Sequence, residues 1–227
     1  MKRVTLRVAA PAMILIVIGG IAMLRPFKSW FSRKPADVGT LIECSCSSGG
    51  GMTGGHSDIR LKQTADGITL TIEDQPWFGA LIKTTVYRAD DDALAQVQAH
   101  VDRFDLTRWV DLPPTDLIVL DAPSIHYELD YDNTRNGGRA TEYYVIDGDV
   151  QPPKGGEGAL HELSRLMTQW AEDDRLLSRT WTDTEGNVID VDALKAPDGS
   201  WTCPFCHHAG NTGWQCEECR MERPWVE

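Results

Sequence analysis

Two pairs of cysteines near the end of the chain constrain its fold more than any other feature. Cys203 and Cys206 form one Cys-x-x-Cys step, and Cys216 and Cys219 form a second one nine residues later. Each step lets a tight turn direct two sulfurs at one ion, and four thiolates complete the tetrahedral shell of a structural zinc site. The sequence therefore predicts a structural Zn²⁺ bound by Cys203, Cys206, Cys216 and Cys219 in a zinc ribbon or finger over residues 193–227.

Three other interpretations of these residues remain open. The Cys203-Pro-Phe-Cys206 step resembles the redox dithiol of glutaredoxins, but that chemistry needs a βαβ frame after the motif, and only 21 residues follow Cys206. Two disulfides would form if the chain were secreted. Either His207 or His208 could replace a thiolate, because imidazole also binds zinc. Since four cysteines already complete the shell, both histidines are expected to be exposed turn residues.

The same segment resembles the short zinc fingers of the Ran-binding-protein (nucleoporin) type. The matching residues are Trp201, Cys203, Cys206, Asn211, Cys216 and Cys219, followed by Arg223-Pro224. The resemblance implies a bound zinc and a small two-hairpin shape. It departs from the family pattern, since the loop between the pairs is one residue shorter, Asn211 falls one position late, and His207-His208 stands where ubiquitin-binding members have Thr-Phe. It therefore carries over no ligand, and a generic bacterial zinc ribbon matches equally well.

Charge is distributed very unevenly along the chain. The net charge is −12, yet all seven charges in residues 1–34 are positive, so residues 35–227 carry 15 basic and 34 acidic residues, a net −19. Such a body is repelled by phosphate backbones. This disfavours nucleic acid as a partner, despite the finger.

The first 34 residues are predicted to form a basic membrane anchor. Residues 8–24 are uncharged, and 17 residues is the lower limit for a helix that crosses a bilayer. Basic residues flank this segment on both sides. We expect a single transmembrane helix with the lipid bilayer as its partner; a signal peptide cleaved near Ala22 is the alternative. Basic residues after the span and reduced thiols favour a cytoplasmic body in a single-pass membrane protein. The body resembles uncharacterised bacterial membrane proteins, which implies no activity.

Residues 35–192 are predicted to form an acidic α+β domain. Period-two patterns indicate strands, and Asp66-Gly67 and Asn136-Gly137-Gly138 indicate hairpin turns. Asp90–Asp92 is expected to cap a helix. The expected strands are 40–47, 58–63, 68–73, 83–88, 124–131 and 140–146, with helices at 93–104 and 159–177 and a linking hairpin at 180–191. This order predicts an antiparallel sheet with two helices packed on one face, and it places Cys44 and Cys46 on one strand face as buried free thiols.

Known catalytic patterns fail along this domain, so no catalytic or cofactor-binding residue is assigned. Gly49, Gly51 and Gly54 formally satisfy GxGxxG, but a strand rather than a helix is predicted next. The four histidines outside the finger are scattered, and His161-Glu162 lacks the second histidine of HExxH. The Gly-rich segment is either a flexible connection or a loop that binds a ligand through bare backbone amides.

These observations favour a membrane-tethered binding or scaffold protein that acts through protein–protein contacts. Two alternatives remain: a membrane-tethered hydrolase that uses the Gly-rich loop 48–55 with acids such as Asp121 or Glu128, and a secreted protein stapled by disulfides. The absence of a concave pocket beside residues 49–55 would count heavily against the hydrolase.

Overall fold

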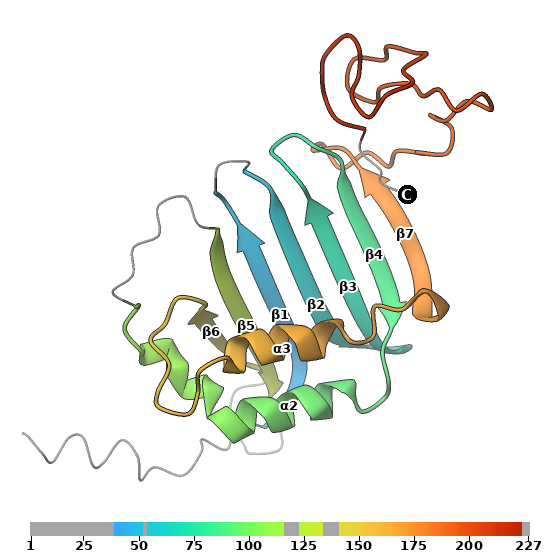
Figure 1. The fold of residues 1–227 in the computed structure, drawn as a ribbon. Coiled ribbons are helices and arrows are strands. Elements are labelled where there is room, and N and C mark those ends of the chain that lie inside the picture. The colour runs from blue at the N-terminus through green and yellow to red at the C-terminus, as the bar shows by residue number, and fades with distance from the viewer. Residues whose placement is uncertain (1–38, 52–53, 116–122, 134–140, 224–227) are drawn as a thin grey trace, which may run out of the picture. The chain divides into compact units, whose positions relative to one another are not determined.

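The computed structural model describes residues 39–51, 54–115, 123–133 and 141–223. A seven-stranded antiparallel sheet dominates them, with the strand order β6-β5-β1-β2-β3-β4-β7 (Figure 1). The strands are β1 (Thr40–Gly49), β2 (His56–Thr64), β3 (Gly67–Gln75), β4 (Ile82–Arg88), β5 (Ser124–Asp132), β6 (Thr141–Asp147) and β7 (Leu176–Thr182).

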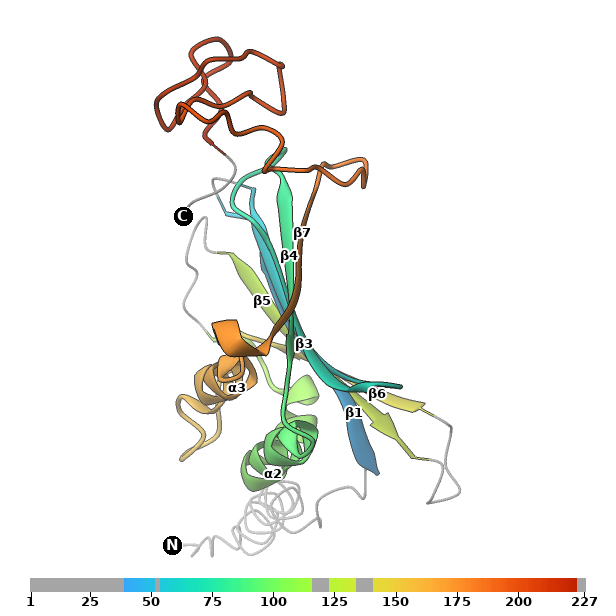
Figure 2. The same ribbon diagram turned by 90° about the vertical axis from the view of Figure 1, so that its right-hand side faces the viewer.

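Two α-helices, α2 (Ala93–Phe104) and α3 (Ala159–Thr168), cover one face of this sheet (Figure 2). Short 3₁₀ turns, η1 (Leu106–Asp111) and η3 (Asp173–Arg175), follow them. Each helix buries one apolar stripe, with Leu94, Val97 and Val101 on α2 and Leu160, Leu163 and Met167 on α3. These stripes pack on inward side chains of the central strands, which include Cys44, Leu61, Leu70, Leu129 and Tyr131.

Alternation along the strands separates a covered face from an open one. In β5, Tyr127, Leu129 and Tyr131 are buried against the helices, while the residues between them turn to the other face. The β2–β3 hairpin forms as its turn signal predicts, with Thr64 paired to Gly67, whose φ of +120° suits a residue without a Cβ. Cys44 and Cys46 are both buried and free, as expected for thiols on one strand face.

The segment after α3 differs from the expectation. The helix predicted over 159–177 ends at Thr168, and Leu176–Thr182 forms β7, which pairs with β4 at the edge of the sheet. The predicted 180–191 hairpin is reduced to a turn at Asp183–Asn187 with one bridge between Thr182 and Val188. The apolar spacing extends past Thr168, but pairing with β4 selects extended backbone for the leucines that follow.

The acidic run before α2 also behaves differently from the prediction. Asp92 occupies the N-cap position, but its side chain makes no cap hydrogen bond and instead accepts one from Gln96. Asp90 accepts hydrogen bonds from Arg175 at 2.7 Å and from the Trp170 indole at 3.1 Å. These bonds lower the pKa of Asp90 below its usual value, with the Arg175 bond as the larger cause. The run therefore ties α2 to the segment that leads into β7.

The predicted fold class is wrong in including a transmembrane helix. The predicted single-pass membrane localisation depended on that helix and is wrong for the same reason. No helix in the described part of the chain is long and apolar enough to cross a bilayer. The two α-helices have 12 and 10 residues, about 18 and 15 Å at 1.5 Å per residue, against a hydrocarbon core of about 30 Å. The predicted span, residues 8–24, lies outside the described residues.

Candidate functional site

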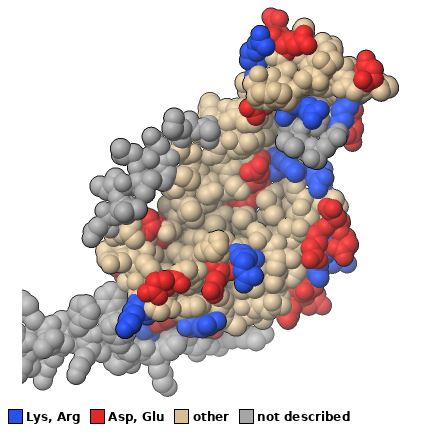
Figure 3. Space-filling view, in the orientation of Figure 1, with Lys and Arg blue, Asp and Glu red and all other residues tan. Residues whose placement is uncertain are grey.

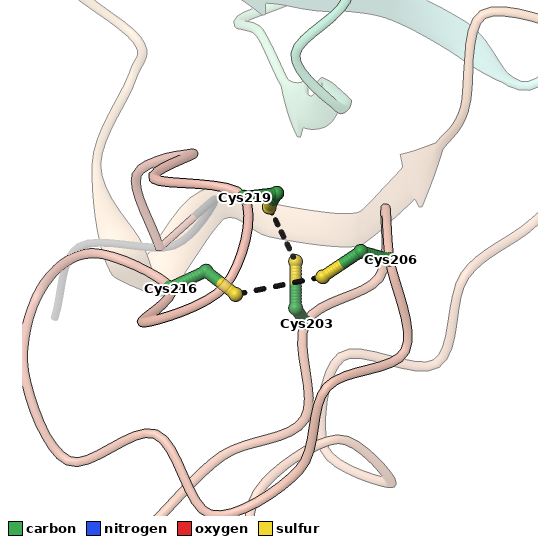
Figure 4. Close-up of side chains that lie close together, drawn as sticks. All are labelled: Cys203, Cys206, Cys216 and Cys219. Atoms are coloured by element: carbon green, nitrogen blue, oxygen red, sulfur yellow. Dashed lines mark hydrogen bonds between the residues drawn. The ribbon is translucent and has the colours of Figure 1, made fainter.

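The four predicted ligands meet in a single cluster. The sulfurs of Cys203, Cys206, Cys216 and Cys219 all lie within 4.8 Å of one another, and the side chains converge from two separate turns (Figure 4). The Cys203 and Cys219 sulfurs are 3.6 Å apart, and those of Cys206 and Cys216 are 3.5 Å apart. Tetrahedral zinc with Zn–S bonds of about 2.3 Å requires S···S separations of about 3.8 Å, whereas a disulfide requires about 2.05 Å. The cluster is therefore positioned to bind a metal ion, and its spacing is unlike that of two disulfides.

Two turns of the same design present the sulfurs. In the first, Cys203 donates its N–H to the carbonyl of His208, and His207 donates back to the carbonyl of Cys203. In the second, Cys216 donates to Met221, and Arg220 donates back to Cys216. His207 and Arg220, each following the second cysteine of a pair, have φ values of +61° and +63°. Each pair thus lies on a closed turn whose geometry is set by backbone hydrogen bonds, which we name the first and second knuckle.

Backbone N–H groups also point at the sulfurs. Burial raises the pKa of the Cys203 thiol to about 12 against opposing bonds from the N–H groups of Cys206 and Phe205. Burial likewise raises the pKa of Cys216, but the N–H groups of Cys219 and Glu218 and the neighbouring thiols outweigh it, so the pKa falls to about 6. N–H donors at both first cysteines suit thiolates, the form in which cysteine binds a metal.

A buried asparagine joins the two knuckles. Asn211 is fully buried, and its amide donates to the carbonyls of Trp201 and His208. Its Oδ1 accepts the N–H of Glu217 in the second knuckle at 2.9 Å. Because one side chain satisfies backbone groups on both sides of the cluster, it fixes the distance between the cysteine pairs.

The two tryptophans of the finger have opposite environments. Trp201 is 2% exposed, packs with Cys203 and Cys216, and donates its indole N–H to the carbonyl of Gly213 at 2.8 Å. Trp214, in the loop between the knuckles, is 62% exposed. Trp201 was one of the residues that carry the family resemblance. Nothing in the sequence indicated that Trp201 would be buried and Trp214 exposed.

The cluster's chemistry is that of a closed site. Four sulfurs fill all four positions of a tetrahedral shell, so no position remains for water or substrate. The histidines beside it are not part of the cluster: the His207 side chain is exposed, and His208 contributes its carbonyl to the knuckle. An ion held here would stabilise the finger rather than catalyse a reaction.

A pocket of about 410 Å³ lies on the open face of the sheet, beside the Gly-rich connection. Its lining includes Ser47, Gly49, His56, Asp58, Glu73 and His126. The connection itself is closed by Gly50 donating to Gly55, and a Cβ on Gly55 would lie 2.6 Å from the Gln75 and Pro76 carbonyl oxygens. Glycine therefore lets the β1–β2 turn approach the start of the β3–β4 loop and shape one side of the pocket.

Of the two acids suggested for a hydrolase, the structure describes Glu128 alone, and Glu128 does not line this pocket. Glu128 lies on the open face, where it accepts a 3.5 Å hydrogen bond from Ser45, but it is not among the lining residues. Asp121 lies outside the described residues. The pocket instead brings together His56 and His126, which the sequence presented only as scattered histidines.

No protein-family model and no curated protein sequence matches this chain.

Proposed function

We propose that this chain is a protein-binding protein whose C-terminal finger is a structural zinc ribbon of the Ran-binding-protein type or a close variant, and that the finger presents Trp214 to a protein partner. Zn²⁺ suits the cluster because a closed four-thiolate shell is the usual structural zinc site. The finger has little core of its own, since within its described part, up to residue 223, the buried cluster consists of Trp201, Cys203 and Cys216. A bound ion therefore supplies the rigidity that a docking surface needs.

The observation that carries the binding role is the exposure of Trp214. An indole that is 62% exposed gains from burial in a partner, and tryptophan is among the residues most enriched in binding hot spots. Around the second knuckle, three exposed acids outnumber the exposed Arg220; they are Glu217, Glu218 and Glu222. Aromatic and acidic side chains together favour a partner with a basic surface that surrounds an apolar recess.

The charge on the rest of the molecule supports the same choice of partner. On the face that carries α2 and α3, basic side chains stand among acidic ones (Figure 3). Together with the net −19 on residues 35–227, this mixed surface disfavours nucleic acid and favours contacts between proteins.

The binding role is tested by capture of partners from cell extract with three forms of the full chain: wild type, Trp214→Ala, and Phe78→Ala as the control. Phe78 is 83% exposed but belongs to the loop between β3 and β4. We expect Trp214→Ala to lose partners that Phe78→Ala retains, and raised salt to weaken the capture. Identical partner sets for wild type and Trp214→Ala would contradict the proposal that the finger binds a partner through Trp214.

Metal identity is tested separately. Native mass spectrometry of the full chain is expected to show one zinc per molecule, and Co²⁺ substitution is expected to give the strong thiolate charge-transfer absorption of a four-sulfur site. Loss of the metal in Cys203→Ser but not in Cys46→Ser would assign it to the finger, since Cys46 is a free thiol of the sheet. Retention of the full metal content by Cys203→Ser would contradict the assignment.

A further inference from the structure

A row of polar side chains crosses the open face of the sheet at the pocket. The strand registers pair Ser47 of β1 with His126 of β5, and pair His126 with Asp147 of β6. On its other side, Ser47 is paired with Asp58 of β2. Directly opposed residues on one face of an antiparallel pair have Cβ atoms about 4.5–5.5 Å apart. An acid, an imidazole and a hydroxyl therefore lie side by side in that order, followed by a second acid.

The imidazole in this row is oriented by its acid. The Nδ1 atom of His126 lies 2.8 Å from Oδ1 of Asp147. A carboxylate accepts only, so Nδ1 carries the hydrogen, and in the neutral ring the lone pair is on Nε2. An acid that fixes the tautomer in this way makes the other ring nitrogen available as a general base.

In the row, Ser47 lies between Asp58 and His126, and its hydroxyl bonds to Asp58. The Ser47 Oγ donates to Oδ2 of Asp58 at 2.6 Å, and the Ser47 residue is half-buried, so a reagent in the pocket can reach it. Serine side chains occupy staggered rotamers, and a change of χ1 turns Oγ from the β2 side of the row towards the β5 side. There the hydroxyl faces His126, its direct cross-strand neighbour. The hydrogen bond to Asp58 therefore keeps the hydroxyl turned away from His126, and a bound substrate would have to break this bond before Ser47 could react.

We propose that this pocket is an active site for hydrolysis of small carboxylic esters, with Ser47 as the nucleophile, His126 as its general base and Asp147 as the positioning residue. The site uses no residue of the finger and so goes beyond the proposed binding role. The volume of about 410 Å³ is within the range of small-molecule sites. Arg60 also lines the pocket, and its guanidinium is paired with Glu43 at 3.4 Å and with Asp58 at 3.5 Å. We assign this cation to the negative charge that develops on the carbonyl oxygen.

The reaction balances without any further reagent. Ser47 Oγ bonds to the acyl carbon as its proton passes to Nε2 of His126; the ester C–O bond then breaks, and the leaving alcohol takes that proton. Water attacks the acyl-serine, giving a proton to His126, and Ser47 Oγ recovers it as the carboxylic acid departs. Asp147 keeps its carboxylate throughout and stabilises the imidazolium.

The first test is labelling of the full chain with an alkyl fluorophosphonate, followed by peptide mass spectrometry. An activated serine forms an Oγ–P bond with this reagent and releases fluoride, and the serine proton passes to the base. We expect the label on Ser47, no label at that position in Ser47→Ala, and at least a tenfold slower reaction in His126→Gln. Ser178→Ala, an exposed serine of β7 outside the pocket, should label at the wild-type rate.

The role of Asp147 needs its own comparison. Asp147→Asn should slow labelling at least tenfold because the amide can offer its N–H to Nδ1 and select the wrong tautomer. Asp147→Glu should recover most of the rate, which a merely structural effect of the substitution would not produce. The row positions are on the open face of the sheet, and circular dichroism of each variant is the check that it is folded.

Turnover is measured with p-nitrophenyl acetate. Release of p-nitrophenol by wild type but not by Ser47→Ala would support the proposal. Three results would overturn it: an unlabelled Ser47 in the folded wild type, equal labelling in His126→Gln, or equal p-nitrophenol release by wild type and Ser47→Ala. None of these results bears on Trp214 or on the metal.

Discussion

The sheet and the finger are stabilised by different means. Among the residues that the structure describes, the sheet and its helices share a core of 23 buried residues, whereas the finger's buried cluster has three, two of which are cysteines of the metal cluster. Burial of apolar area stabilises the first region, at about 25 cal/mol per Å². The second region has too little apolar area for that, and it relies on four sulfurs and backbone hydrogen bonds. The two regions should therefore respond to different perturbations.

Metal removal is expected to have the largest effect, and it should be confined to the finger. Structural zinc contributes about 10–16 kcal/mol of apparent binding free energy in small finger peptides. A strong chelator should therefore unfold residues 201–223 and leave the sheet intact. Two-dimensional ¹H–¹⁵N NMR of the full chain measures both regions at once. Loss of dispersed sheet resonances on chelation would contradict the separation, and return of the finger resonances on adding Zn²⁺ is the control.

Truncation of a core leucine should destabilise the sheet and leave the finger unchanged. Leu129 is fully buried between the sheet and the helices, and Leu→Ala at such sites lowers the free energy of unfolding by about 2–5 kcal/mol. Leu129→Ala should shift the urea midpoint of the sheet while the zinc content stays at one per molecule. Leu177→Ala, at a residue 48% exposed on β7, is the matched control and should change the free energy by less than about 0.5 kcal/mol. A loss of zinc in Leu129→Ala would show that the two regions are coupled.

Asn211 tests whether backbone hydrogen bonds share the stabilisation of the finger with the metal. Asn211→Ala removes the acceptor of the Glu217 N–H, while the Trp201 and His208 carbonyls keep their backbone donors, the N–H groups of Asn211 and Cys203. Leaving one such donor without its partner costs about 1–3 kcal/mol. We expect about a 10- to 100-fold loss of zinc affinity, measured by competition with a chromogenic chelator. Asn187→Ala removes an exposed asparagine that bonds only to Asp183 and should leave the affinity unchanged. If wild type, Asn211→Ala and Asn187→Ala had equal zinc affinities, the hydrogen bonds of Asn211 would contribute nothing and the thiolates alone would account for the finger's stability.

The sequence predicted elements whose cause is local. The Asp66 turn signal and the alternation around it predict the β2–β3 hairpin, and the spacing of Leu94, Val97 and Val101 predicts α2 within its observed bounds. The prediction from sequence was wrong at β7, where Leu176 and Leu177 continue an apolar pattern that is typical of a helix. The pairing that makes them a strand joins Tyr87 to Leu176, residues far apart in the chain, so no local pattern could reveal it.

The two candidate sites differ in the same way. The four cysteines are recognisable because the spacing within each pair is itself the geometry of the site. The pocket row has no such spacing, since Ser47, His126 and Asp147 come from three strands and meet only through the register. Each of these residues alone is an ordinary polar residue on an open sheet face. A site of this kind becomes visible only when the order of the strands is known.

The smallest expected effect concerns the contact between Asp90 and Arg175, which links α2 to the entry of β7. The folded-state pKa of Asp90 is lowered, so its contribution is present above the unfolded pKa of about 3.9 and is lost as the pH falls through the folded value. Urea midpoints of wild type and Asp90→Asn, measured from pH 6 to pH 2, should therefore differ most at pH 6 and converge in acid. Both partners are partly exposed, so the difference should be modest and should shrink at high salt. Asp91→Asn, an exposed neighbour, should follow the wild-type curve. A constant gap between wild type and Asp90→Asn down to pH 2 would mean that the Asp90 carboxylate charge contributes nothing and that shape alone accounts for the difference.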